Sequence, residues 1–95
     1  MLNGKQRAQL RAMANGLDTV LTVGKDCVSP ELTSAVSEAL EARELIKLGV
    51  LNNCADETKS VAEMLSGRTR SDIVQVIGNK IILYRKSKKK PIIEI

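Results

Sequence analysis

The sequence predicts a single compact α/β domain whose elements follow the order α-β-α-β-α-β-β. Segments with apolar residues at helical spacing alternate with short segments rich in β-branched residues, and a Gly-Asn pair joins the last two short segments. The length of 95 residues fits one small domain. Because helices between strands favour parallel pairing and a hairpin is antiparallel, we expect a mixed four-stranded sheet packed with helices.

The first expected helix spans residues 3–14. Its apolar positions recur at helical spacing through Leu10 and Met13, and its alanines raise helix propensity. Arg7 and Arg11 lie four residues apart on a different face, so we expect both arginines to point outward.

A strand, a turn and a second helix are expected next. Residues 17–23 are rich in β-branched side chains, which favour a strand. A turn follows at residues 24–28. Ser29 and Pro30 then provide a hydroxyl N-cap and a proline at the first helical position. The helix that follows, residues 30–42, carries apolar residues on one side only.

The middle of the chain predicts another strand and a third helix. Residues 44–51 alternate between apolar and polar side chains, as in a half-buried strand. Residues 56–66 return to helical spacing, with Asp56 as the expected N-cap and Gly67 as the residue that ends the helix.

The C-terminal part predicts a hairpin followed by a tail. Residues 73–77 and 80–85 are apolar and β-branched, and the Gly78-Asn79 pair between them tolerates the positive φ of a two-residue turn. A run of charges and a proline then predict an open, mobile tail over residues 87–95, within which residues 92–95 could pair as an edge strand. We therefore divide the chain into a domain, residues 1–86, and a basic tail.

The composition argues against most catalytic and metal chemistry. The chain has no His, which is the commonest general base and zinc ligand. Helix capping accounts for the adjacent acids Asp56 and Glu57 without catalysis. Cys27 and Cys54 have no second Cys nearby in the sequence, so in a reducing cytosol we expect two small, half-buried thiols. We expect no enzyme activity, no cofactor and no metal.

Charge is distributed unevenly along the chain. The net charge is +4, but residues 1–11 contribute +3, residues 80–90 contribute +6, residues 12–79 contribute −4 and Glu94 contributes the last −1. Such a distribution can present a basic patch to a polyanion, although the lysine run could equally be a solubilising tail. Because no apolar run is long enough to span a membrane and charges interrupt the first residues, we expect a cytoplasmic protein without membrane contact.

The turn at residues 24–28 could receive an anion. It leads from a strand into a helix, so free backbone N–H groups and the positive end of the helix dipole face the same space beside Lys25. It lacks the second glycine and the Gly-Lys-Ser/Thr ending of a nucleotide-binding loop. A single phosphate of an RNA backbone requires only a short loop that can be approached closely and one or two cations. The alternative is that Gly24 is present only because the turn requires it and binds nothing.

The residue types favour structured RNA over other nucleic acids. Tyr84 is the only aromatic residue, so bases cannot stack on a series of rings, and we expect this side chain to belong to the sheet core. The helix at residues 30–42 exposes Glu31, Glu38 and Glu41, which disfavours reading of DNA bases. The remaining mode of binding is recognition of the backbone and shape of structured RNA by Lys and Arg.

Several segments resemble those of the YhbY family, the stand-alone bacterial form of the CRM domain. The two signature segments are residues 39–48 (ALEARELIKL) and 74–85 (VQVIGNKIILYR), and residues 4–11 and 23–25 also match the family's positions. The resemblance extends over nearly the whole chain, roughly residues 3–86. It implies an RNA-binding domain with a fold similar to the C-terminal domain of translation initiation factor three, and an association with precursors of the large ribosomal subunit.

The resemblance also implies an RNA-contacting Gly-x-x-Gly turn between the first strand and the second helix. Here that turn is Gly24-Lys25-Asp26-Cys27, in which a cysteine replaces the second glycine. Because a positive φ would strain Cys27, we expect a different local turn. Asp26 opposes a phosphate, so we expect the turn to bind more weakly and the basic termini to carry more of the affinity.

We therefore expect a monomeric, non-enzymatic protein that binds ribosomal RNA within a pre-ribosomal particle and takes no small-molecule substrate. The expected RNA-binding residues are Lys5, Arg7, Arg11, Gly24, Lys25, Asp26, Cys27, Lys80, Arg85, Lys86 and Lys88. We expect cations from both termini to converge beside the Gly24 turn as a single landing site. The alternative is an adaptor that contacts a ribosomal or translation protein and little RNA. The sequence identifies neither the RNA element nor the assembly stage.

Overall fold

The computed structural model describes residues 2–93 and confirms the predicted order of elements. The elements, in chain order, are α1 (Gly4–Ala14), β1 (Thr19–Val23), α2 (Pro30–Arg43), β2 (Leu45–Val50), α3 (Thr58–Thr69), β3 (Asp72–Ile77) and β4 (Lys80–Tyr84). None of the described helices is long and apolar enough to cross a membrane.

The four strands form one mixed sheet in the order β1-β2-β4-β3. β1 and β2 are parallel and are connected through α2, whereas β4 is antiparallel to both of its neighbours. The predicted hairpin between β3 and β4 is confirmed: Gly78 has a φ of 54°, and the Asn79 side chain donates to the Val50 carbonyl at 3.2 Å. The hairpin turn therefore lies at the same end of the sheet as the C-terminal ends of β1 and β2.

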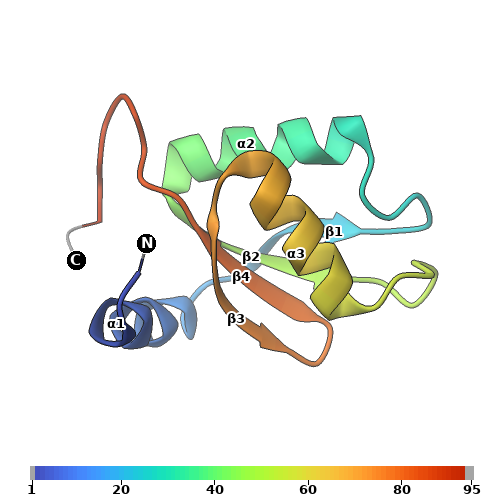
Figure 1. Cartoon of the computed structure of the whole chain (residues 1–95), viewed down its shortest axis with the longest axis horizontal. Helices are drawn as coiled ribbons and strands as arrows, with labels where there is room; N and C mark the ends of the chain where they lie inside the picture. Colours follow the sequence, from blue (N-terminus) through green and yellow to red (C-terminus); the bar gives the residue numbers. More distant parts are fainter. Residues whose placement is uncertain (1, 94–95) are drawn as a thin grey trace.

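The sheet has helices on both of its faces (Figure 1), and each face carries its own apolar core. On one face, α2 and α3 pack over a core that includes Ile46 and Leu83. On the other face, α1 packs over Leu45 and Tyr84, so the expectation that Tyr84 is a core residue is confirmed. This alternation of neighbouring side chains arises because successive strand residues point to opposite faces.

The first helix buries a different face from the predicted one. Asn3 and Gln6 form a capping box at its start, and Leu10 and Ala14 are fully buried against the sheet. Met13 is 46% exposed, whereas Arg7 is half-buried. The predicted burial of Leu10 is confirmed, but the prediction that Met13 shares its buried face and that both arginines point fully outward is wrong. The small Ala14, rather than Met13, takes the buried position against the sheet.

The third helix is shifted relative to its prediction. It begins at Thr58 after Glu57, without a side-chain cap, and it continues through Gly67. It ends at Arg70, whose φ of 57° is left-handed, and the Ser71 N–H donates to the Ser66 carbonyl at 3.0 Å. Asp56 is thus not the N-cap, and the left-handed position that ends the helix is taken by arginine instead of glycine.

The described part of the tail is anchored to the domain, contrary to the predicted open, mobile tail. Glu44 follows α2 and is fully buried. Its carboxylate accepts backbone N–H groups from Ser87 at 2.7 Å and from Ile92 and Ile93 at 2.6 Å each. Glu41, one helical turn earlier, accepts from the hydroxyl of Ser87 and from the backbone of Lys88. These bonds join residues more than forty positions apart, which local patterns do not reveal.

The predicted edge strand at the C-terminus is not formed over Ile92 and Ile93, whose N–H groups both bind Glu44 instead of a neighbouring strand. The rest of that prediction, residues 94–95, lies outside the described residues.

Candidate nucleic-acid interface

The turn between β1 and α2 keeps the form expected of a Gly-x-x-Gly turn despite its cysteine. Cys27 has a φ of 51°, in the left-handed region that favours glycine, and its N–H donates to the Gly24 carbonyl at 3.0 Å. The prediction of a different local turn is therefore wrong. Lys25 and Asp26 occupy the two central positions and are both exposed. Ser29 then caps the first turn of α2, where its hydroxyl accepts from the Leu32 N–H at 3.1 Å.

The two cysteines form a disulfide, which corrects the prediction of two separate thiols. Cys27 and Cys54 lie with their Cα atoms 5.2 Å apart and their sulfur atoms bonded. They meet because β1 and β2 are parallel neighbours in which Val23 pairs with Val50, so the loops that follow both strands leave the sheet at the same edge. Residues 27 positions apart are thereby adjacent in space, although no local cysteine spacing indicates it.

Among residues 2–93, one group could offer three ligands to a metal ion. It consists of Cys27, Cys54 and Asp56, whose ligand atoms lie within 4.8 Å of one another. With the two sulfur atoms joined as a disulfide, neither cysteine offers a thiolate, so this arrangement favours a covalent link between the two loops over a metal centre.

Charges nearly cancel at the turn. The cation Lys25 stands beside Asp26, and Asp56 lies close to Cys27 on the neighbouring loop. Lys80 begins β4 opposite Gly49, and its Nζ lies 3.1 Å from where a Cβ on Gly49 would be. Of the predicted residues outside the turn, Lys80 is therefore at this end of the sheet. Two cations lie there with two carboxylates, and Glu31 adds a third acid in the first turn of α2.

The predicted single landing site is wrong, because the termini lie far from the turn. The molecule measures 36 Å along its longest axis, and Figure 1 shows the Gly24 turn at one end of that axis, with α1 and the tail at the other. Strand pairing gives the same result: Lys80 pairs with Gly49 near the turn, whereas Tyr84 pairs with Leu45. One strand length, roughly 17 Å at about 3.4 Å per residue, separates Arg85 from the turn's end of the sheet.

The predicted basic residues of the first helix lie on the face of the sheet opposite α2 and α3. Lys5 is exposed, whereas Arg7 and Arg11 are half-buried. The Nε of Arg7 is buried without a hydrogen-bond partner among the described residues. The first helix therefore offers one exposed cation and two that are half-buried.

Arg85 has a structural role that its sequence context does not reveal. Its guanidinium donates to the Ser37 carbonyl at 2.8 Å, to the Ser37 hydroxyl at 3.1 Å and to the Thr69 carbonyl at 2.8 Å. These bonds connect the end of β4 to the middle of α2 and the end of α3. Truncation of Arg85 should therefore lower the stability of the domain, in addition to any effect on RNA binding.

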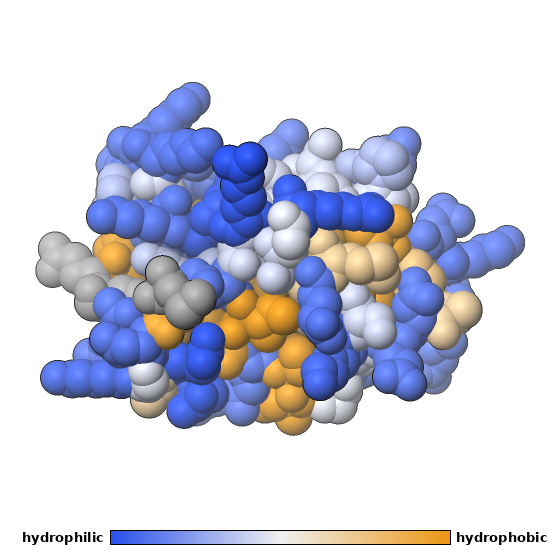
Figure 2. Space-filling model, viewed as in Figure 1, coloured by the Kyte–Doolittle hydropathy of each residue, from blue (hydrophilic) through white to orange (hydrophobic). Residues whose placement is uncertain are grey.

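A hollow of about 390 Å³ lies where these three elements meet. Its lining residues are Ser37, Arg68, Thr69, Arg70, Arg85, Lys86 and Lys88. Three of these were predicted RNA-binding residues, whereas Arg68 and Arg70 were missed because residues 68–72 appear in the sequence as a polar connector. Their alternation with threonine and serine at the end of a predicted helix was the available signal. Hydrophilic side chains dominate the upper part of the surface in Figure 2, over the end of α3.

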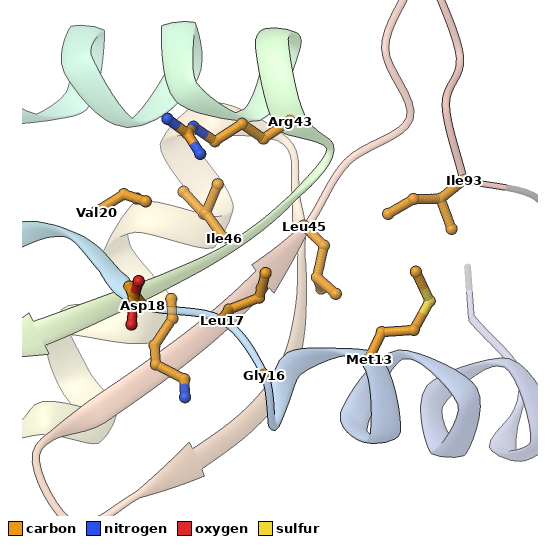
Figure 3. A pocket seen from close by; sticks show the side chains of 10 residues that line it. Met13, Gly16, Leu17, Asp18, Val20, Arg43, Leu45, Ile46 and Ile93 are labelled. Carbon is orange, nitrogen blue, oxygen red and sulfur yellow. The ribbon is translucent and has the colours of Figure 1, made fainter.

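A second hollow, of about 340 Å³, lies beside the end of α1 and the start of β1 (Figure 3). Apolar side chains including Met13, Leu17 and Ile93 line it together with Arg43 and Asp18. It contains none of the predicted RNA-binding residues, and its mainly apolar lining distinguishes it from the hollow at the end of α3.

The model of the CRS1 / YhbY (CRM) domain matches residues 2–85. The chain belongs to the CRM domain family. It is 47% identical to the probable RNA-binding protein YqeI of Bacillus subtilis (strain 168), over 100% of this chain and 99% of YqeI. The probable RNA-binding protein PA4753 of Pseudomonas aeruginosa is 30% identical, over 93% of this chain and 85% of that protein.

A solved structure also confirms the fold of this CRM domain. The solution structure of the hypothetical protein SAV1595 from Staphylococcus aureus superimposes with a TM-score of 0.83 at 44% sequence identity. The match covers 100% of this chain and 99% of that structure. The compact α/β fold predicted from the sequence is thus the fold of a relative of known structure.

Proposed function

We propose that this CRM domain is a non-enzymatic, monomeric, cytoplasmic protein that binds structured ribosomal RNA through backbone and shape contacts during assembly of the large ribosomal subunit. The observation that carries the proposal is the turn of residues 24–27, whose left-handed Cys27 and exposed Lys25 retain the form of a Gly-x-x-Gly turn. Relatives that match over most of this chain are named probable RNA-binding proteins.

The turn is suited to a strand of RNA for two reasons. At Gly24 no side chain protrudes, and the nearest neighbours of a Cβ built there are Asn53 and Leu51 at 3.9 Å, so a backbone can approach closely. The start of α2 directs N–H groups toward the same space, and these favour an anion. Since charges at the turn nearly cancel, contact there depends on shape more than on net attraction.

Substitutions at the two central positions of the turn test this contact. We expect Lys25→Gln to weaken binding of a large-subunit RNA fragment and Asp26→Asn to strengthen it, each by roughly threefold, because each changes one exposed charge beside a phosphate. Fluorescence anisotropy with labelled RNA measures both. Asp18→Asn, which removes an exposed acid beyond the opposite end of β1, is the matched control and should have a smaller effect.

The identity of the RNA is tested by crosslinking in cell extract followed by sequencing of the bound RNA. We expect precursors of the large subunit to be enriched over other transcripts. Recovery of no specific RNA, together with co-sedimentation with ribosomal particles that survives high salt, would contradict the proposal and favour the adaptor alternative.

A further inference from the structure

We propose that the arginine-rich hollow at the end of α3 is a second phosphate site, which receives a phosphate group of RNA at the end of the molecule opposite the Gly24 turn. The assignment of that phosphate to RNA rests on the proposed function. The site itself rests on five cationic side chains from two separate segments that line one hollow of about 390 Å³, and none of its lining residues is acidic.

Arg85 forms the fixed wall of the hollow. All three of its hydrogen bonds go to neutral acceptors on Ser37 and Thr69, so they hold the guanidinium in place and leave its positive charge without a bonded carboxylate. A guanidinium held in advance loses little side-chain entropy when an anion binds nearby. The hollow therefore contains a preorganised positive charge.

Arg70 supplies a second cation from a backbone position that usually belongs to glycine. Its φ of 57° is left-handed, and the bond from the Ser71 N–H to the Ser66 carbonyl holds it there. A glycine or asparagine would end the helix at lower cost. Strained positions occur preferentially at binding sites, and here the strained residue directs a cation into a hollow that contains other cations.

The anchored tail positions the remaining lysines. Ser87 is buried, because its N–H donates to the carboxylate of Glu44 and its hydroxyl donates to the carboxylate of Glu41. Its two neighbours, Lys86 and Lys88, therefore lie at the surface and line the hollow. Glu41 and Glu44 stand behind this segment and carry negative charge. The hydrogen bond from Ser87 and those from the backbone N–H groups lower the pKa of Glu41. The lining itself contains five cations and no acid, and the two acids behind it interact with Arg85 and Lys86, so positive charge is in excess at the hollow.

The location of the hollow determines what it can contact. It lies at the end of the sheet where β4 leaves, whereas the Gly24 turn lies at the other end, so a single phosphate cannot reach both. The two sites would take phosphates from different positions along one RNA or from two RNA segments. The source of the phosphate is either an internal phosphodiester or a terminal phosphomonoester, and the hollow fits the chemistry of both.

The first test titrates the full chain with inorganic phosphate and follows the amide resonances by NMR. We expect phosphate to shift the amide resonances of Ser37, Thr69, Arg70 and Ser87 but not those of the Gly24 turn. The double variant Arg70→Asn/Lys88→Gln should lose these shifts and bind RNA at least about tenfold more weakly. Asparagine tolerates the left-handed position, so the variant should melt at or above the wild-type temperature. Lys59→Gln, an exposed lysine in the first turn of α3, is the control.

Three forms of one RNA hairpin identify the source of the phosphate: a 5′-hydroxyl form, a 5′-monophosphate form and a circular form. Equal affinities that all decrease in the double variant would assign an internal phosphodiester. A preference for the monophosphate that the double variant abolishes would assign a terminal phosphate. If phosphate shifts the resonances at the hollow but the wild type binds no RNA, the hollow is a phosphate site and the proposed function is wrong. RNA binding that the double variant leaves unchanged, with no phosphate shifts at the hollow, would overturn the second site.

Discussion

At the scale of single residues, Cys27 combines two opposing effects on stability. Its left-handed φ of 51° disfavours any residue with a Cβ, by about 1 kcal/mol relative to glycine. Its bond to Cys54 closes a chain segment of 27 residues, and loop-closure entropy then predicts a stabilisation of about 3.5 kcal/mol. The cysteine is therefore favourable only while the disulfide is intact.

The effect of Cys27→Gly on the free energy of unfolding should therefore have opposite signs without and with reductant. Without reductant we expect it to lower the free energy of unfolding by about 2.5 kcal/mol, and with excess reductant to raise it by up to about 1 kcal/mol. Urea unfolding in both conditions measures these values. Cys54→Ala is the control, because it removes the bond and keeps the strained residue. A glycine variant that is more stable than the wild type without reductant would show that the disulfide does not form in solution.

At the scale of elements, Glu44 connects α2, β2 and the tail. It ends α2, its carbonyl accepts the Arg85 N–H at 2.9 Å, and its buried carboxylate accepts three N–H groups from the tail. Burial alone would raise the pKa of Glu44, but the bonds from Ile93, Ser87 and Ile92 outweigh it and hold the pKa below the ordinary 4.5. The charged carboxylate thus stabilises the folded state.

The pH dependence of stability should reveal this carboxylate. A group whose pKa is lower in the folded state contributes stability above its unfolded pKa, so the free energy of unfolding should fall as the pH decreases below about 4.5. Glu44→Gln should cost about 2–3 kcal/mol at pH 7, since its amide nitrogen cannot accept from the tail, and should show a weaker decrease in acid. Urea unfolding between pH 7 and pH 3 tests this, with the exposed Glu63→Gln as control. Equal acid sensitivity of the wild type and Glu44→Gln would contradict the argument.

Arg85 makes a second connection between elements, from β4 to α2 and α3. We expect Arg85→Ala to lower the free energy of unfolding by about 2–3 kcal/mol, because it leaves the acceptors on Ser37 and Thr69 without their charged donor. Lys25→Ala, an exposed residue in a turn, should change it by less than about 0.5 kcal/mol. Thermal and urea unfolding compare the two. An Arg85→Ala protein as stable as the wild type would mean that these bonds contribute nothing in solution.

Whether a feature of this fold could be predicted from the sequence depends on how far apart in the chain the interacting residues are. Local patterns predicted the strands, the hairpin at Gly78 and the helix that begins after Ser29, since backbone preference and capping act over a few residues. The clamp of Glu44 on the tail and the pairing of Cys27 with Cys54 depend on contacts between residues 27 or more positions apart. For the same reason, the basic residues of the two termini could be listed from their charge and the turn from the family resemblance, but Arg68 and Arg70 were missed. The separation of the candidates into two ends of the sheet could not be predicted.

At the scale of the whole molecule, positive charge is concentrated at the end away from the Gly24 turn, and this distribution determines how binding responds to salt. If about five phosphates are neutralised, log K should fall against log salt with a slope near −3.5 for single strands.

Each cation removed from the arginine-rich hollow should reduce that slope by about 0.7, so Arg70→Asn and Lys88→Gln should each flatten it. Asp26→Asn should strengthen binding with little change in slope, because it removes a repelling acid and leaves the number of neutralised phosphates unchanged. Titrations of labelled RNA from 50 to 300 mM salt, on the order of the range over which counterion release is measured, provide the slopes of the wild type and of all four variants. A wild-type slope near zero would contradict phosphate neutralisation at either end, and equal flattening by the exposed Lys59→Gln would show that net charge alone, rather than the hollow, accounts for the effect.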